Sequence, residues 1–108
     1  MKQVIVIGAG GHGRVIADIV LRNNDVLLGF LDDAHTEPIW DYPVLGMVQD
    51  WRQYADKAVF VLGIGSNAAR RRLSKEISGP WYTAVHPSAQ IGIDVIIGPG
   101  TVVMAHAG

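Results

Sequence analysis

The chain has 108 residues, 49% of them hydrophobic, which suffices for one compact domain and excludes a disordered chain. Nine basic and ten acidic residues give a net charge of −1, so no global field attracts nucleic acid or an anionic membrane. The absence of cysteine excludes disulfides and thiolate metal sites. Because the first apolar run is too short for a signal or membrane segment, we expect a soluble, cytoplasmic protein.

The amino-terminal third predicts a strand, a helix and a second strand. The β-branched run Gln3–Ile7 is typical of a strand buried on both faces, as in a parallel sheet. Apolar residues recur at helical spacing after Gly13, and residues 23–25, Asn-Asn-Asp, predict the end of that helix. Val26–Leu31 predicts the second strand.

The middle of the chain repeats this order in outline. Residues 34–46 predict an irregular loop with a short extended piece at its end, and Val48–Tyr54 predicts a short helix. Ala58–Leu62 is another buried-strand run that ends in glycines. A further helix is expected from Ser66 onward, followed by a last strand over Trp81–Val85. These elements indicate an α/β fold with a doubly wound parallel sheet.

The last 24 residues repeat every six, a pattern typical of a left-handed β-helix. The first position of each hexad is aliphatic: Val85, Ile91, Ile97 and Val103. Four hexads make little more than one coil, and several stacked coils are needed for stability. We therefore expect a Rossmann-like α/β domain over residues 1–85 and the start of a truncated left-handed β-helix over residues 86–108, within a longer protein.

The loop after the first strand predicts a nucleotide site. Gly8, Gly10 and Gly13 have G-x-G-x-x-G spacing between a strand and a helix. Such glycines allow close approach, and the N–H groups at a helix start stabilise phosphate. Asp32 follows Gly13 by nineteen residues, about where an acidic residue meets a ribose, and Asp33 comes next. Alternatively, Gly10 and Gly13 only permit close packing of the strand and the helix, and the acidic pair is a solvated turn.

Other candidate ligand contacts flank this loop. His12 lies within it, either contacting the ligand or facing solvent from the first turn of the helix. A second glycine turn, residues 63–67, follows another parallel strand and so faces the same crevice. In that turn Gly65 allows backbone approach, and Asn67 either contacts the ligand or caps its helix. Arg70, one turn later, is a candidate phosphate contact. The histidines lack metal-ligand spacing, so we predict no metal site.

The ordered set of motifs resembles the sialic-acid and bacillosamine-type sugar O-/N-acetyltransferases. The resemblance covers essentially the whole chain and rests on residues 8–13, Asp32-Asp33, Gly65-Ser66-Asn67 with Arg70, and His86-Pro87-Ser88-Ala89 running into the hexads. It implies an amino-terminal domain that binds a nucleotide-activated amino sugar, UDP- or GDP-linked, in bacterial glycan biosynthesis. It also implies a β-helix that binds acetyl-CoA as co-substrate and assembles as a homotrimer.

The resemblance further implies residue roles. Gly10, Gly11 and His12 would line the nucleotide-sugar site, Asp32 and Asp33 would hold the nucleoside, and Gly65 would contact the ligand. The family's catalytic base is a histidine beside an acidic residue, further along the β-helix. His106 has no acidic neighbour, so that role is not assigned to any residue, and we expect the 108-residue chain to bind substrate without catalysing the transfer.

Two other functions remain open on the sequence. The glycine motif is also found in NAD(P)-binding domains of oxidoreductases, although the hexapeptide repeats argue against that class. A non-catalytic nucleotide-binding module is the second alternative.

Overall fold

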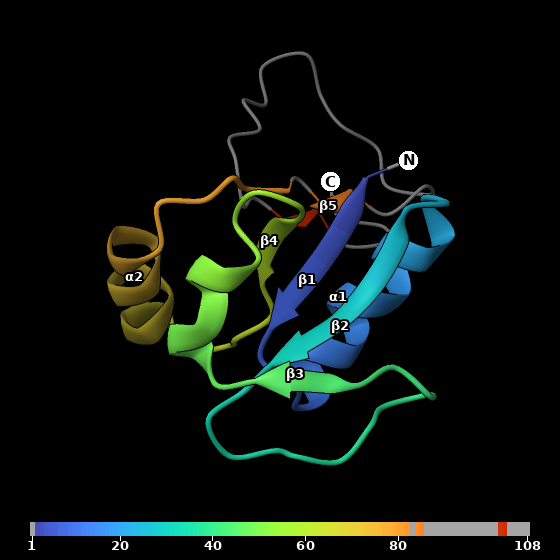
Figure 1. Ribbon diagram of the computed structural model, residues 1–108, viewed down its shortest axis with the longest axis horizontal. Coiled ribbons are helices and arrows are strands. Elements are labelled where there is room, and N and C mark those ends of the chain that lie inside the picture. The colour runs from blue at the N-terminus through green and yellow to red at the C-terminus, as the bar shows by residue number, and fades with distance from the viewer. Residues whose placement is uncertain (1, 83, 86–101, 104–108) are drawn as a thin grey trace.

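The computed structural model of the protein describes residues 2–82, 84–85 and 102–103. Its centre is a parallel four-stranded sheet in the order β3-β2-β1-β4, shown in Figure 1. The strands are β1 Gln3–Ile7, β2 Val26–Leu31, β3 Val44–Gly46 and β4 Val59–Leu62. The helices are α1 Gly11–Arg22, the 3-10 helix η1 Val48–Gln53 and α2 Asn67–Glu76. The predicted α/β fold is therefore confirmed.

The sheet is covered on both faces, which explains its continuous apolar strands. Alternate side chains of a strand point to opposite faces, so Val4 and Val6 pack with α1, whereas Ile5 and Ile7 pack in the cluster that includes α2 residues. All four side chains are fully buried. Figure 1 shows α1 behind the sheet, away from η1 and α2. This two-faced burial confirms the parallel-sheet prediction for residues 3–7.

Helix α1 begins earlier than the sequence indicated. We expected it after Gly13, but Gly10 is the N-cap and Gly11, His12 and Gly13 form the first turn. Glycine is a weak helix former, so the tertiary environment and not local propensity sets this start. Val15 has helical apolar spacing, yet it is 43% exposed, because it faces away from the sheet.

The segment after α2 differs from the single strand expected over residues 81–85. Trp81 forms an isolated parallel bridge with Phe60 of β4. Two residues of the expected strand form β5, Ala84–Val85, which pairs in parallel with β6, Val102–Val103. Most of the predicted β-helix, residues 86–101 and 104–108, lies outside the described residues.

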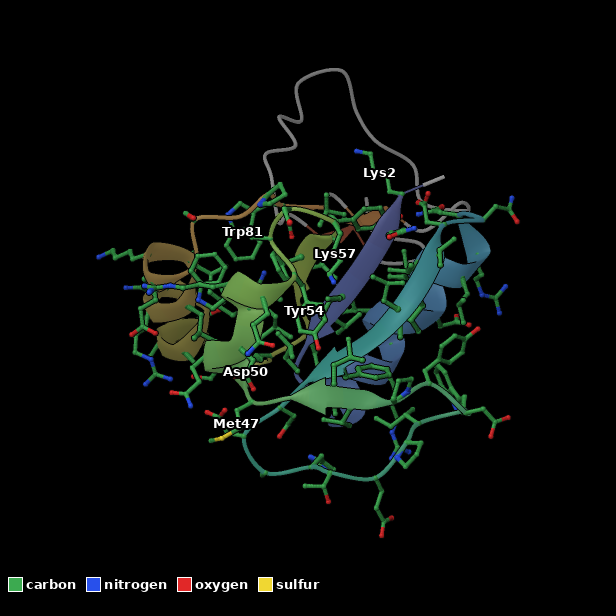
Figure 2. The ribbon with its side chains drawn as sticks, in the orientation of Figure 1. Lys2, Met47, Asp50, Tyr54, Lys57 and Trp81 are labelled. Carbon is green, nitrogen blue, oxygen red and sulfur yellow. The ribbon has the colours of Figure 1, made fainter. Side chains whose placement is uncertain are left out.

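A partly buried polar cluster lies at the amino edge of the sheet. The hydroxyl of Tyr82 donates to Asp25 Oδ2 at 2.5 Å and accepts from Asn23 Nδ2 at 3.3 Å. The backbone N–H of Lys2 donates to the other oxygen of Asp25 at 3.0 Å. Burial, followed by the bond to Asp25, raises the pKa of Tyr82 to about 12. Figure 2 shows Lys2 at this edge and Met47 at the opposite one.

Within the described part of the chain, no helix combines the length and the apolar character needed to cross a bilayer.

Candidate functional site

Three turns meet at the carboxyl edge of the sheet. The turn after β1 is tied to β2 because the N–H of Gly8 donates to the carbonyl of Leu31 at 2.8 Å. The turn after β4 is tied to β1 because the N–H of Gly63 donates to the carbonyl of Ile7 at 2.8 Å. Ligands of open parallel sheets bind at this edge. The structure therefore brings the two glycine turns and the acidic pair to one side of the molecule, as predicted.

Gly8, Gly13 and Gly63 are packing glycines. A Cβ added to Gly13 would lie 1.9 Å from the carbonyl oxygen of Gly8, and one added to Gly63 would lie 2.7 Å from the Cα of Gly13. Gly8 has a φ of 109°, in the left-handed region that favours glycine, and its added Cβ would lie 2.7 Å from the oxygen of Gly63. The backbones of the two turns are thus in direct contact. The close-packing alternative holds for Gly13 but not for Gly10, and Gly8 is a packing glycine as well.

Gly10, Gly11 and Gly65 have a different environment. Apart from the adjacent residues and the backbone of the same helix, no atom of the described residues would lie within 4 Å of a Cβ added to any of the three. Gly11 and Gly65 are exposed, and Gly10 is half-buried. Packing does not explain these three glycines, and the approach of a ligand to their backbone stays a prediction.

The start of α1 presents backbone N–H groups to this open space. Gly10 supplies no capping side chain, and no side-chain hydrogen bond caps the helix. The first-turn N–H groups of an α-helix have no intrahelical acceptor and lie at the positive end of the helix dipole. His12 lies in this turn with an exposed side chain. The arrangement is suited to binding an anion without a basic side chain.

Asp32 links the turn after β1 to the turn after β2. Its Oδ2 accepts the backbone N–H of Ala9 at 2.7 Å. Its Oδ1 accepts the N–H groups of Ala34 at 2.7 Å and of His35 at 2.8 Å. Sequence reasoning treated this carboxylate as a ligand contact and missed its three bonds within the protein. A nucleoside contact through the remaining lone pair of Oδ2 stays a prediction.

The carboxyl group of Asp32 is held in its ionised form. Burial alone would raise its pKa, but the N–H groups of His35, Ala9 and Ala34 and the nearby His35 ring outweigh burial and lower the pKa below the usual value. His35 Nδ1 lies 3.6 Å from Asp32 Oδ2, and its side chain is half exposed. A negative charge is therefore fixed at the end of β2 at neutral pH.

Asp33 and Asp50 both order the start of η1. Asp33 Oδ1 accepts the N–H of Val48 at 2.9 Å, and Asp50 Oδ2 accepts the N–H of Met47 at 2.9 Å. Figure 2 shows Met47 and Asp50 together at this end of the helix. The exposed Asp33 also lines a groove of about 870 Å³ between η1 and α2, whose wall includes Trp51. Asp33 is thus both a loop tether and part of a cleft.

The second glycine turn has its own helix cap. Ser66 is the N-cap of α2, and its Oγ accepts the N–H of Ala69 at 3.3 Å. The capping role considered for Asn67 is therefore wrong, because Asn67 is already the first residue of the helix. Its side chain is exposed, and Arg70 is half-buried one turn later. A ligand contact by either side chain stays a prediction.

In the ranges that the structure describes, no group of three histidine, aspartate or glutamate side chains has a geometry that could hold a metal ion.

A family model described as the PglD N-terminal domain matches residues 3–77. UDP-N-acetylbacillosamine N-acetyltransferase of Bacillus subtilis is 31% identical to this chain over an alignment 113 positions long. The alignment covers 97% of this chain and 52% of that protein. The chain therefore spans about half the length of this relative.

Solved structures of acetyltransferases share the fold. The acetyltransferase domain of PglB from Neisseria gonorrhoeae, in complex with acetyl coenzyme A, has a TM-score of 0.88 at 29% identity, covering 96% of this chain and 53% of that one. A mutant perosamine N-acetyltransferase from Caulobacter crescentus, in complex with CoA and GDP-perosamine, has a TM-score of 0.88 at 25% identity, covering 97% and 52% respectively.

Proposed function

Because the chain belongs to the PglD N-terminal domain family, we propose that it is the nucleotide-sugar-binding portion of an acetyl-CoA-dependent sugar N- or O-acetyltransferase. The observation that carries the proposal is the uncapped start of α1 beside two open glycines, Gly10 and Gly11. Relatives with this domain are acetyltransferases named for nucleotide-linked sugars, UDP-N-acetylbacillosamine and GDP-perosamine.

The diphosphate of the ligand binds at the glycine loop. Backbone N–H groups of the first turn of α1 donate to phosphate oxygens, and the helix dipole stabilises the negative charge. Gly10 and Gly11 leave room for the phosphates, since apart from adjacent residues and the backbone of the same helix no atom of the described residues lies within 4 Å of their missing Cβ positions. The exposed His12 adds a side-chain donor next to them. Gly8 and Gly13 contribute by holding the loop in shape.

The remaining candidates surround the same crevice. Asp33 lines the groove beside η1, and it would hold the nucleoside. Gly65 is open to solvent on the other side of the glycine loop. Asn67 and Arg70 lie on the first turn of α2 and would reach the sugar or a phosphate. No metal ion is required in this scheme, because backbone amides neutralise the phosphate charge.

The chemistry of the whole protein takes place in the acetyl-CoA-binding β-helix. A histidine acts as general base and removes a proton as the sugar amine or hydroxyl attacks the thioester. The described strands support such a β-helix here: β5 and β6 pair in parallel, with Val85 opposite Val103. Val85 and Val103 are the first residues of the first and fourth hexads, so their positions differ by three hexads. Three hexads make up one coil of a left-handed β-helix. The proposal includes a homotrimer in the cytoplasm.

Separate calorimetric titrations test the proposal, with UDP-N-acetylglucosamine, GDP-mannose and NADH as probes. We expect one or both nucleotide sugars to bind and NADH to bind weakly or not at all. Acetyl transfer by the 108-residue chain is not expected. Tight binding of NADH without any response to the nucleotide sugars would replace the proposal with the NAD(P)-binding alternative.

A further inference from the structure

The carboxylate of Asp32 makes more hydrogen bonds within the protein than a residue that only contacts a ligand would need. Its carboxylate accepts three backbone N–H groups, and both of the bonds to Oδ1 come from the turn after β2, at Ala34 and His35. The bond to Oδ2 comes from Ala9, in the turn after β1. A carboxylate has about four lone-pair sites, so three are filled before any ligand arrives.

The bond to Ala9 continues the contact between β1 and β2 past the ends of the strands. The N–H of Gly8 donates to the carbonyl of Leu31, and the next N–H along the chain, that of Ala9, donates to Asp32. Ala9 is fully buried, and the open glycines follow it directly. The carboxylate of Asp32 therefore determines where the glycine loop starts its turn into α1.

We infer that Asp32 is a positioning residue, an inference that rests on the proposed function. Its carboxylate joins the two turns that bound the crevice. It thereby holds the glycine loop in the form that receives the diphosphate. This role differs from a ribose contact, because it acts on the phosphate end of the ligand through the backbone of Ala9. A loop ordered in advance loses no conformational freedom when the ligand binds, which favours affinity.

The substitution Asp32→Asn tests this role with almost no change of shape. An amide has one oxygen, so its Nδ2 must replace one of the two carboxylate oxygens, and Nδ2 cannot accept an N–H. Either the bond to Ala9 is lost, or a neutral oxygen keeps it while both bonds from Ala34 and His35 are lost; in both cases the charge-assisted bond to Ala9 is gone. Since a charged hydrogen bond is involved, we expect UDP or GDP to bind about tenfold to hundredfold more weakly.

The ligand pair that separates the two roles is a nucleoside diphosphate and its 2′,3′-dideoxy form. If Asp32 positions the glycine loop, Asp32→Asn weakens both ligands by the same factor, because both carry the diphosphate. If Asp32 instead holds a ribose hydroxyl, the loss is confined to the ligand that has one, and the inference is overturned. An unchanged affinity for both ligands also overturns it.

Asp50→Asn is the matched control. Asp50 likewise accepts a backbone N–H, that of Met47, but it belongs to η1, and its other hydrogen bond comes from Gln53 of the same helix. Its substitution should leave nucleotide affinity within about twofold. An equal loss in both variants would mean that general destabilisation, and not loop positioning, explains the result.

A second readout follows the loop itself by amide hydrogen exchange. In the folded Asp32→Asn protein the amide of Ala9 should exchange faster, whereas that of Ala69, capped by Ser66, should not change. If Asp32→Asn does not fold, the affinities of Asp32→Glu for the same two ligands are measured instead. This substitution keeps the charge but displaces the oxygens. An equal loss for both ligands supports the inference, and a loss confined to the ligand with ribose hydroxyls overturns it. Wild-type protein that binds neither UDP nor GDP would refute the proposed function itself.

Discussion

The two glycine turns of this protein look alike in sequence and differ in how the following helix begins. In the first, Gly10 is the N-cap of α1 and provides no side-chain acceptor for the helix. In the second, Ser66 is the N-cap of α2, and its Oγ accepts the N–H of Ala69. The first turn therefore leaves its helix start available to an anion, whereas the second satisfies its own.

The two turns also differ in what holds them in place. The first is tethered to β2 by the carboxylate of Asp32 through the N–H of Ala9. The second contacts the first through backbone atoms, with Gly63 against Gly13. In the proposed function one strand-glycine-helix unit would receive the ligand while the other packs against it, and the difference depends on two capping positions, Gly10 and Ser66.

The largest loss in the free energy of unfolding is expected for a substitution at the contact between the two turns. In Gly13→Ala the new Cβ would lie 1.9 Å from the carbonyl oxygen of Gly8, so backbone must move. We expect a loss of roughly 3 kcal/mol or more in the free energy of unfolding, measured by denaturant titration. The control Gly65→Ala, with open space around it, should stay within about 0.5 kcal/mol of wild type. Equal stabilities would contradict the packing role of Gly13.

Acid should loosen the first turn before the second. The folded protein lowers the pKa of Asp32, so this carboxylate stabilises the fold above its ordinary pKa of 3.8, and the contribution is lost as pH falls through the lowered value. As pH falls from about 5 to about 3 and below, the protection of the Ala9 and Ala34 amides against exchange, relative to the intrinsic rate at each pH, should fall, because both amides bond to Asp32. Ala69, whose cap is the non-titrating Ser66, serves as the reference. Simultaneous loosening of all three amides would argue against a local tether.

A smaller effect is expected at the cap of the second turn. Ser66→Ala removes the acceptor for the N–H of Ala69 and should cost about 1 kcal/mol of unfolding free energy. Asn67→Ala should change it by less than about 0.5 kcal/mol, because Asn67 is not the cap. Thermal and denaturant unfolding of both variants measure the difference. A larger cost at Asn67 would reverse the assignment of the cap.

The smallest change in the free energy of unfolding is expected for a substitution of Gly11 in the first turn. The same substitution should cause a clear loss of nucleotide affinity. Gly11 is the first residue of α1 and has no neighbour within 4 Å of its missing Cβ among the described residues. Gly11→Ala should therefore raise stability slightly, by up to about 0.5 kcal/mol, since alanine is the better helix former. The added methyl occupies the space of the phosphates, so affinity for UDP or GDP should fall about tenfold. Unchanged affinity would remove Gly11 from the site.

Local patterns were sufficient to predict much of the site. The spacing of Gly8, Gly10 and Gly13 after a buried strand predicted a glycine loop at the sheet edge, and the structure has that loop. The roles within it could not be read from the spacing, because a packing glycine and an open glycine are the same residue in different surroundings. The bonds of Asp32 were missed for a related reason, since its partner Ala9 lies 23 residues away in the chain.

The sequence by itself determined the alternation of buried strands and helices, because apolar periodicity is a local property that any compact arrangement must satisfy. It also determined that Asp32 follows β2 directly. Only the tertiary structure decided that Gly13 packs against Gly8, that Gly10 and Gly11 stay open, and that Asp32 faces the backbone of Ala9. These outcomes depend on which strands are neighbours in the sheet, and that pairing joins residues far apart in the chain.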